Sequence, residues 1–240
     1  SEPRLVRMMM PNGTATPEYR WFVAVSSGYN NYQADGRASS NGAQALFLLS
    51  LDKAAGDTWT ENTNYFKMKL SAPATGMVAA LANPGVAKDA QGNAIIFYAG
   101  DTQGNLWKFD LQSGLTTANA ASAVKSVPLA QLRDKDGKRQ PMTTVPQVVP
   151  GLSGGYMVIF GTGKYLESAD NATTETNSVY GIWDNLGTNA TDDYNVKRSQ
   201  LYQRKFDTGT NLADGDEVFT FGNGTTSGTY RGWYLDLPAV

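Results

Sequence analysis

Short apolar runs, each ended by a glycine or an aspartate, recur along the 240-residue chain. The runs are rich in Val, Ile, Phe, Tyr and Trp, and polar turn residues separate them, which is typical of β-strands joined by turns. Helical periodicity is scarce, and its best candidate, Ala118–Gln131, reads as a short helix or a loop. The pattern predicts strands over Trp21–Ser27, Ala45–Leu51, Ile95–Ala99, Leu106–Phe109, Tyr156–Phe160, Val179–Trp183 and Trp233–Leu235.

These strands form a repeated unit in which a first strand closes on Gly and a second strand closes on Asp. The unit occurs three times, and a fourth second strand follows near the end of the sequence. Because a small sheet cannot bury both of its faces alone, such units stack radially into a β-propeller. Fewer units are present than the roughly 4–8 blades of a closed ring. We therefore predict an all-β fold, a partial, modified β-propeller with long polar loop insertions. It forms a single domain over 1–240, with blade-like units at about 21–70, 95–150, 156–186 and 200–240.

Composition excludes several classes of function. The formal net charge of −2 provides no basic stripe for nucleic acid, so we expect no nucleic-acid partner. No apolar run approaches the roughly 20 residues that span a bilayer, so an integral membrane segment is not expected. The absence of Cys and His rules out disulfides, thiol catalysis and the common forms of catalytic triad and zinc site. The sequence begins at Ser1 without a signal peptide, which we interpret as mature or excised material.

Three motifs in a fixed order carry more specific information. They are YAGDTQGNLWKFDL at Tyr98–Leu111, FGTGKYLE at Phe160–Glu167 and SVYGIWDN at Ser178–Asn185. Together with the segments Trp21–Asn31 and Arg231–Pro238, the trio resembles the carboxy-terminal domain of the PilY/PilC family of type IV pilus tip-associated adhesins.

That resemblance implies a modified β-propeller that is exported to the cell surface. It implies a non-catalytic structural and adhesive module that acts in pilus biogenesis, twitching motility and surface attachment. The partners implied are pilins or minor pilins and a host or abiotic surface. The location implied is extracellular, at the pilus tip or the outer-membrane surface of a bacterium.

The resemblance also raises the question of calcium, since many members of the family carry an EF-hand-like loop just before the YAGD strand. It places the ligand positions of that loop on Ala87, Asp89, Gln91 and Ile95, with the turn glycine at Gly92. Calcium takes six to eight oxygen ligands. Only Asp89 is a carboxylate, and the side chains of Ala87 and Ile95 offer no oxygen. We therefore predict a degenerate loop that binds no calcium, and a chain that takes no cofactor.

Four tyrosines are candidates for binding because they lie among polar residues and are expected to be exposed. They are Tyr29, Tyr32, Tyr194 and Tyr202. An exposed tyrosine beside Asn and Ser offers a rigid apolar ring and a polar hydroxyl, which suits contacts with protein or glycan. Ordinary packing of loop tyrosines is the alternative interpretation.

Two other functions share the propeller fold. A quinone-dependent dehydrogenase would need a stacking Trp, a catalytic Asp and calcium ligands near the propeller axis, and the sequence shows no cluster of calcium ligands. A carbohydrate-binding propeller lectin would use exposed aromatic rings, which the polar loops of this chain could present.

Overall fold

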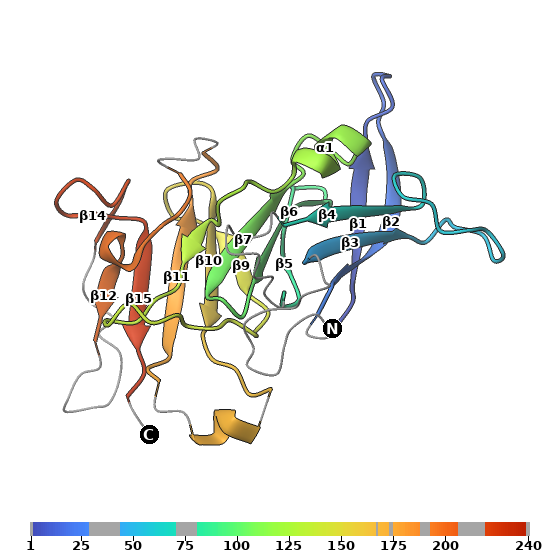
Figure 1. Ribbon diagram of the computed structural model, residues 1–240. Coiled ribbons are helices and arrows are strands. Elements are labelled where there is room, and N and C mark those ends of the chain that lie inside the picture. Colours follow the sequence, from blue (N-terminus) through green and yellow to red (C-terminus); the bar gives the residue numbers. More distant parts are fainter. Residues whose placement is uncertain are drawn as a thin grey trace. The chain divides into compact units, whose positions relative to one another are not determined.

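The computed structural model describes residues 2–28, 44–70, 81–166, 168–172, 175–187, 193–205 and 219–238. The regular elements of the described residues are mainly strands (Figure 1). In chain order the elements are β1 (Arg4–Met10), β2 (Glu18–Ser26), β3 (Ala45–Ser50), β4 (Tyr65–Lys69), β5 (Gly85–Lys88), β6 (Ala94–Gly100), β7 (Asn105–Asp110), α1 (Thr117–Ser122), β8 (Ala130–Gln131), β9 (Gln147–Pro150), β10 (Tyr156–Gly161), the 3-10 helix η1 (Ser168–Ala172), β11 (Ser178–Asp184), the 3-10 helix η2 (Arg198–Gln200), β12 (Tyr202–Arg204), β13 (Thr220–Phe221), β14 (Thr229–Tyr230) and β15 (Gly232–Asp236).

The chain divides into two compact units, and the prediction of a single domain over 1–240 stays a prediction. The first unit combines Ser1–Ala99 with Trp107–Ser126, and the second combines Gly100–Leu106 with Val127–Val240. All seven strands that the sequence predicted are present, as β2, β3, β6, β7, β10, β11 and β15. The ambiguous segment Ala118–Gln131 contains most of α1, which begins where the Thr116 side chain accepts a hydrogen bond from the backbone N–H of Asn119.

The first unit contains a four-stranded antiparallel sheet in the order β1-β2-β3-β4. Buried and partly exposed positions alternate along its strands, as expected where successive side chains point to opposite faces. We call the face that carries the buried residues the inner face and the opposite one the outer face. The inner face includes Met8, Phe22 and Leu48, which are fully buried.

The inner face belongs to the hydrophobic core of the first unit. Phe97 and Phe109, from β6 and β7, belong to the same core, and so does Ala120 of α1. Phe22 and Phe66 meet edge to face within it, with ring centroids 6.1 Å apart. Burial of these apolar side chains is the main force that holds β1–β4 to the rest of the unit.

The β5–β8 sheet is built on hairpins. β6 lies between β5 and β7, and β7 pairs with the short β8 at Asn105 and Leu106. Ile96 and Phe97, which are neighbours on β6 and point to opposite faces, are both fully buried. This strand is therefore covered on both of its faces.

The second unit contains a five-stranded sheet in the order β12-β15-β11-β10-β9. β15 pairs antiparallel with β11, so strands from the predicted blade-like units 156–186 and 200–240 lie in one sheet. Two glycines make this pairing possible. A Cβ on Gly181 would lie 2.4 Å from the Trp233 ring, and a Cβ on Gly232 would lie 2.0 Å from the Gly181 carbonyl oxygen. The two backbones can approach only because neither residue has a side chain.

A chain of polar side chains lies within the second unit. The Tyr180 hydroxyl is hydrogen-bonded to Gln140 Oε1, and Gln140 Nε2 lies 2.8 Å from the Ser178 hydroxyl. That hydroxyl donates in turn to Asp236 at 2.6 Å, and Asp236 pairs with Arg198. Buried polar groups need such partners, because an unpaired one costs free energy on burial.

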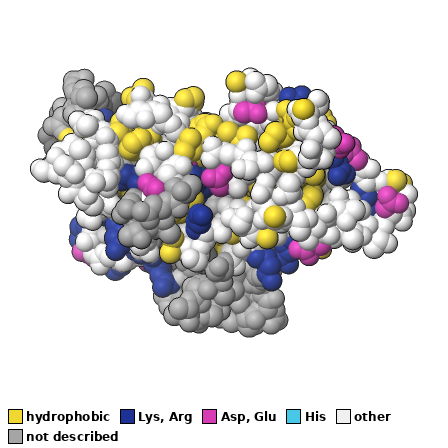
Figure 2. Space-filling model, turned by 90° about the horizontal axis from the view of Figure 1, so that it is seen from above, with side chains coloured by type: hydrophobic (Ala, Val, Ile, Leu, Met, Phe, Trp, Pro, Cys, Tyr) yellow, Lys and Arg dark blue, Asp and Glu magenta, His cyan; other side chains and the backbone are white. Residues whose placement is uncertain are grey.

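On the face seen in Figure 2, basic and acidic side chains are scattered among polar and hydrophobic ones. This mixture agrees with the small net charge of the chain. Among the described residues, no helix is both long and apolar enough to cross a membrane.

Candidate functional site

The structure places two of the four candidate tyrosines. Tyr29 and Tyr32 lie outside the described residues. Tyr194 is only 4% exposed, so the prediction of an exposed side chain is wrong for this residue. The next two residues explain its burial, because the backbone N–H groups of Asn195 and Val196 donate to Pro128 and Leu129 at 2.8 and 2.9 Å. These bonds align the segment beside β8 and hold Tyr194 in the interior, although its sequence neighbours are polar.

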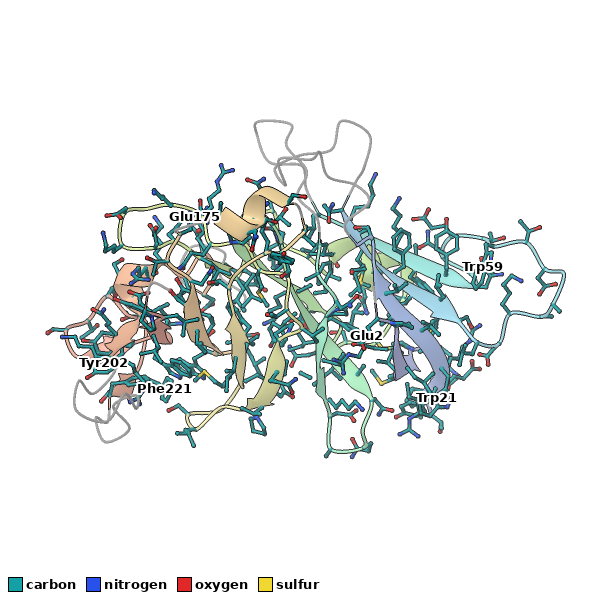
Figure 3. The ribbon with its side chains drawn as sticks, turned by 90° about the horizontal axis from the view of Figure 1, so that it is seen from below. Glu2, Trp21, Trp59, Glu175, Tyr202 and Phe221 are labelled. Atoms are coloured by element: carbon teal, nitrogen blue, oxygen red, sulfur yellow. The ribbon has the colours of Figure 1, made fainter. Side chains whose placement is uncertain are left out.

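Tyr202, the fourth candidate, belongs to a cluster of aromatic rings. Its ring stacks on Phe219 with centroids 5.1 Å apart and an angle of 15° between the planes. Tyr230 meets it edge to face at 5.3 Å. Phe219 also contacts Phe221, at 4.9 Å. Figure 3 shows Tyr202 and Phe221 close together at one end of the second unit.

Trp183 of β11 extends this cluster, with its ring 5.4 Å from Phe221. Its indole N–H donates to the Gly154 carbonyl oxygen at 2.8 Å, which fixes the ring against the turn between β9 and β10. The guanidinium of Arg204 lies over both Tyr202 and Phe219, 5.9 Å from each ring centroid. We refer to Trp183, Tyr202, Phe219, Phe221 and Tyr230 as the aromatic cluster.

Each member of the aromatic cluster is half-buried, so none of these residues is fully enclosed. Aromatic rings hold their geometry at little cost in conformational entropy. The arrangement is suited to contact with another macromolecule. The sequence reasoning singled out only Tyr202. The signal for two of the others was the alternation Phe219-Thr-Phe221, which places both rings on the same side of an extended segment.

The structure places the degenerate calcium loop in a hairpin between β5 and β6. Ala87 and Ile95 lie inside the flanking strands. The Asp89 carboxylate accepts hydrogen bonds from the backbone N–H of Gln91 at 2.9 Å and from the backbone and side-chain amides of Asn93 at 2.8 Å. Slight burial acts to raise the pKa of the Asp89 carboxyl, but these hydrogen bonds and the charge of Arg7 lower it overall.

Within the part of the chain that the structure describes, the same turn occurs three times, beginning at Asp89, Asp101 and Asp134. In each, the aspartate Oδ1 accepts from the backbone N–H groups two and four residues later, at 2.8–3.0 Å. A glycine three residues after each aspartate has a positive φ of 70–81°. We call this unit the Asp turn. Since Asp101 and Asp134 have the same arrangement outside the calcium position, the Asp89 carboxylate fits a structural role.

The absence of calcium from this loop stays a prediction, which the Asp turn supports. Among the residues that the structure describes, no group of three or more acidic side chains is placed to hold a metal ion. The acidic pairs at 192–193 and 214–216 lie wholly or partly outside those residues.

Comparison with known proteins decides the family. The family model described as the PilY1 beta-propeller domain matches residues 8–214. The chain belongs to this family. The resemblance stated from the sequence motifs is therefore confirmed, and so is the prediction of an all-β, modified β-propeller.

Curated relatives within the PilY1 family are named type IV pilus biogenesis factors. The factor PilY1 of Pseudomonas aeruginosa strain PAO1 is 32% identical, over 91% of this chain and 20% of its own length. A PilY1 homolog of Xylella fastidiosa is 33% identical, over 68% of this chain and 11% of its own length. The chain thus spans about a fifth or less of the length of these relatives.

A solved structure agrees with the PilY1 assignment. The crystal structure of the Pseudomonas aeruginosa PilY1 C-terminal domain has a TM-score of 0.67 and 28% identity to this chain. The similarity covers 99% of this chain and 50% of that domain. About half of the PilY1 C-terminal domain therefore has no counterpart in residues 1–240.

Proposed function

We propose that the chain is a non-catalytic structural and adhesive module of a type IV pilus biogenesis factor. It acts in pilus biogenesis, twitching motility and surface attachment, at the pilus tip or the outer-membrane surface of a bacterium. The observation that carries this proposal is the match to the PilY1 β-propeller domain over residues 8–214. The names of the curated relatives support the role in pilus biogenesis.

The aromatic cluster is the contact surface that we assign to this function. Rigid strands hold its rings, since Trp183 lies in β11 and Tyr202 in β12, which both flank β15. Partly exposed aromatic rings beside an arginine are typical of the residues that contribute most to protein interfaces. Pilins or minor pilins are the partners proposed for the cluster, and a host or abiotic surface is the target of attachment.

The test is a ring deletion in the complete parent protein, expressed in its own bacterium. Tyr202→Ala removes the central ring of the aromatic cluster, and Tyr165→Ala is the matched control, because Tyr165 is 75% exposed and belongs to no described ring pair. We expect Tyr202→Ala to reduce attachment and twitching about tenfold, the effect of one contact worth about 1.4 kcal/mol. The control is expected to behave as wild type.

Amount at the cell surface and thermal midpoint are measured for both variants, so that misfolding is separated from loss of contact. If Tyr202→Ala is folded and surface-exposed yet attaches and twitches normally, the aromatic cluster is not the contact surface. If deletion of the whole protein leaves piliation and attachment unchanged, the pilus role itself is wrong.

A carbohydrate-binding lectin is the second candidate, and the half-exposed rings of the aromatic cluster favour it over the quinone-dependent dehydrogenase. A glycan array separates it from the pilus role. Glycan binding that Tyr202→Ala abolishes, with pilin binding unaffected, would support the lectin.

A further inference from the structure

The turn between β13 and β14 contains an asparagine followed by a glycine, a pair that reacts slowly in water. This pair occurs three times in the sequence, as Asn12-Gly13, Asn41-Gly42 and Asn223-Gly224. The second pair lies outside the described residues, and the other two are each followed by a threonine. Asparagine is thermolabile because the backbone nitrogen of the next residue can attack its side-chain amide. A following glycine favours this attack, since it has no side chain to shield the nitrogen.

The fold holds the exposed Asn223 side chain in an arrangement that favours the attack. Its Oδ1 accepts hydrogen bonds from the backbone N–H groups of Thr225 and Thr226, at 3.0 and 3.1 Å. These donors face the oxygen on which negative charge develops when the amide carbon is attacked, so they stabilise the intermediate. Within the part of the chain that the structure describes, the Gly224 N–H donates to no backbone acceptor. The attacking nitrogen is therefore not tied up by the main chain.

The packing of the turn requires the glycine of this pair. Gly224 has a positive φ of 73°. A Cβ at this position would lie 2.6 Å from Gln200 Cβ and 2.8 Å from the Gln200 carbonyl oxygen. Any other residue would combine backbone strain with a collision. The reactive pair is thus a consequence of how the turn folds.

We propose that Asn223 is a site of spontaneous deamidation, and that this reaction alters the aromatic cluster as the protein ages. The Gly224 nitrogen loses its proton to water and attacks Cγ of Asn223. A cyclic imide forms through the new N–Cγ bond, the Cγ–Nδ2 bond breaks, and the leaving nitrogen takes up a proton and departs as ammonia. Water then opens the imide at either carbonyl carbon, which gives aspartate or isoaspartate. The reaction consumes only water and transfers no electrons.

The position of Asn223 connects this reaction to the aromatic cluster. Asn223 follows Phe221 by two residues, and Phe221 pairs with Tyr230 across β13 and β14. Isoaspartate carries the main chain through its side-chain carbon, so it adds one backbone atom to the turn between these strands. The longer turn shifts the Phe221 ring relative to Tyr230 and adds a negative charge beside them. This second half of the proposal rests on the function proposed for the aromatic cluster.

Ageing of the complete parent protein at mildly alkaline pH tests the modification. Peptide mass spectrometry follows the mass gained when a side-chain NH2 is replaced by OH, and an isoaspartate methyltransferase marks the isoaspartate product. Asn62 is the reference, because it is exposed but is followed by Thr63, whose branched side chain shields the backbone nitrogen. We expect Asn223 to react at least about tenfold faster than Asn62. Equal rates would overturn the proposal.

Binding of the aged protein to sheared pili of its own bacterium tests the effect on the aromatic cluster. Asn223→Ser removes the reactive amide and keeps an oxygen that can accept the N–H groups of the turn. Asn12→Ser is the matched control, because Asn12 belongs to the first unit and its Oδ1 likewise accepts from the Thr14 N–H, at 3.1 Å. We expect wild type and Asn12→Ser to lose binding in proportion to the fraction of Asn223 converted. Asn223→Ser should keep its binding.

The remaining outcomes separate this proposal from the proposed function. If aged wild type and aged Asn223→Ser lose binding equally, or if conversion of Asn223 leaves binding intact, the effect on the aromatic cluster is wrong. If no fresh protein binds pili, the proposed contact with pilins fails, while mass spectrometry of wild type still decides whether Asn223 is modified. Thermal midpoints of the fresh proteins reveal any folding defect of the serine variants.

Discussion

At the scale of single residues, Tyr180 is the start of the polar chain in the second unit. Its side chain is 1% exposed, and its hydroxyl lies 3.0 Å from the Arg133 carbonyl oxygen besides its bond to Gln140. The ring stacks on Phe160 at 5.7 Å. The Tyr180 ring therefore packs against apolar neighbours, while its hydroxyl bonds to buried oxygen atoms.

Tyr180→Phe is expected to keep the packing and remove the hydroxyl. The buried Gln140 oxygen then loses its donor, so we expect the free energy of unfolding to fall by about 1–3 kcal/mol. Urea unfolding followed by circular dichroism measures this difference. Tyr165→Phe, at an exposed position, is the matched control and should change stability by less than about 0.5 kcal/mol. Equal stability of the two variants would contradict the role of the polar chain.

The same residue predicts a loss of stability at alkaline pH. Burial raises the pKa of the Tyr180 hydroxyl to about 12 from 10.0, although the charge of Arg198 acts to lower it. Because the folded protein holds this proton more tightly than the unfolded chain, its contribution is complete below pH 10 and is lost as the pH rises toward about 12. Unfolding free energies across this window should fall more steeply for wild type than for Tyr180→Phe. Parallel pH curves would refute the assignment.

Asp89 predicts the response to calcium. Since its carboxylate already accepts hydrogen bonds from Gln91 and Asn93, we expect no submillimolar calcium binding at this loop. Calorimetric titration of wild type and Asp89→Ala with calcium should give the same heats. A submillimolar binding step present in wild type and absent from Asp89→Ala would show that the loop is a calcium site after all.

At the scale of elements, the Asp turn offers a matched pair of glycines. Gly104 and Gly137 both have a positive φ, of 70° and 78°. A Cβ on Gly104 would lie 2.8 Å from the Leu132 carbonyl oxygen and 2.9 Å from that of Gln140, whereas a Cβ on Gly137 would meet nothing within 4 Å. The two positions thus share backbone strain and differ in crowding.

Gly137→Ala is expected to cost about 1–2 kcal/mol, the strain of a left-handed conformation. Gly104→Ala adds a clash with two backbone carbonyls that cannot move independently, so it should cost clearly more. Chemical denaturation of the two variants measures both values. Equal destabilisation would mean that the β7–β8 region relaxes around the added methyl group.

The strands themselves could be predicted from the sequence because their apolar runs end at sharp turn signals. Ile95–Ala99 lies within β6, and Val179–Trp183 lies within β11. β1 was missed because its run, RLVRMMM, contains two arginines and is not closed by Gly or Asp. Its inward positions, Val6 and Met8, nevertheless alternate as a strand requires.

Pairing between distant strands could not be predicted. β15 joins β11 through the close approach of Gly181 and Gly232, and no local pattern reports which glycines will face each other. The prediction that Tyr194 is exposed failed for a similar reason. Its burial depends on hydrogen bonds from the next two residues to Pro128 and Leu129. The polar sequence neighbours of Tyr194 suggested an exposed side chain, whereas a contact between distant segments buries it. The aromatic cluster around Tyr202 was only partly foreseen, since its members come from separate strands.

At the scale of the whole molecule, the length of the chain is to be compared with that of its relatives. It spans about a fifth of the Pseudomonas aeruginosa PilY1 length and half of that protein's solved C-terminal domain. The proposed work in pilus biogenesis and attachment therefore belongs to the parent protein. Residues 1–240 contribute the aromatic cluster that we propose as a contact surface.

The apolar outer face of β1–β4 has a practical consequence for adhesion assays. A separately produced chain would leave Leu5, Trp21 and Leu51 in contact with water, and such side chains adsorb to polystyrene and to alkyl resins without any biological recognition. Binding of the chain to plastic would then include adsorption through these exposed apolar side chains. Attachment to plastic therefore has to be compared between wild type and variants that carry polar residues at these positions.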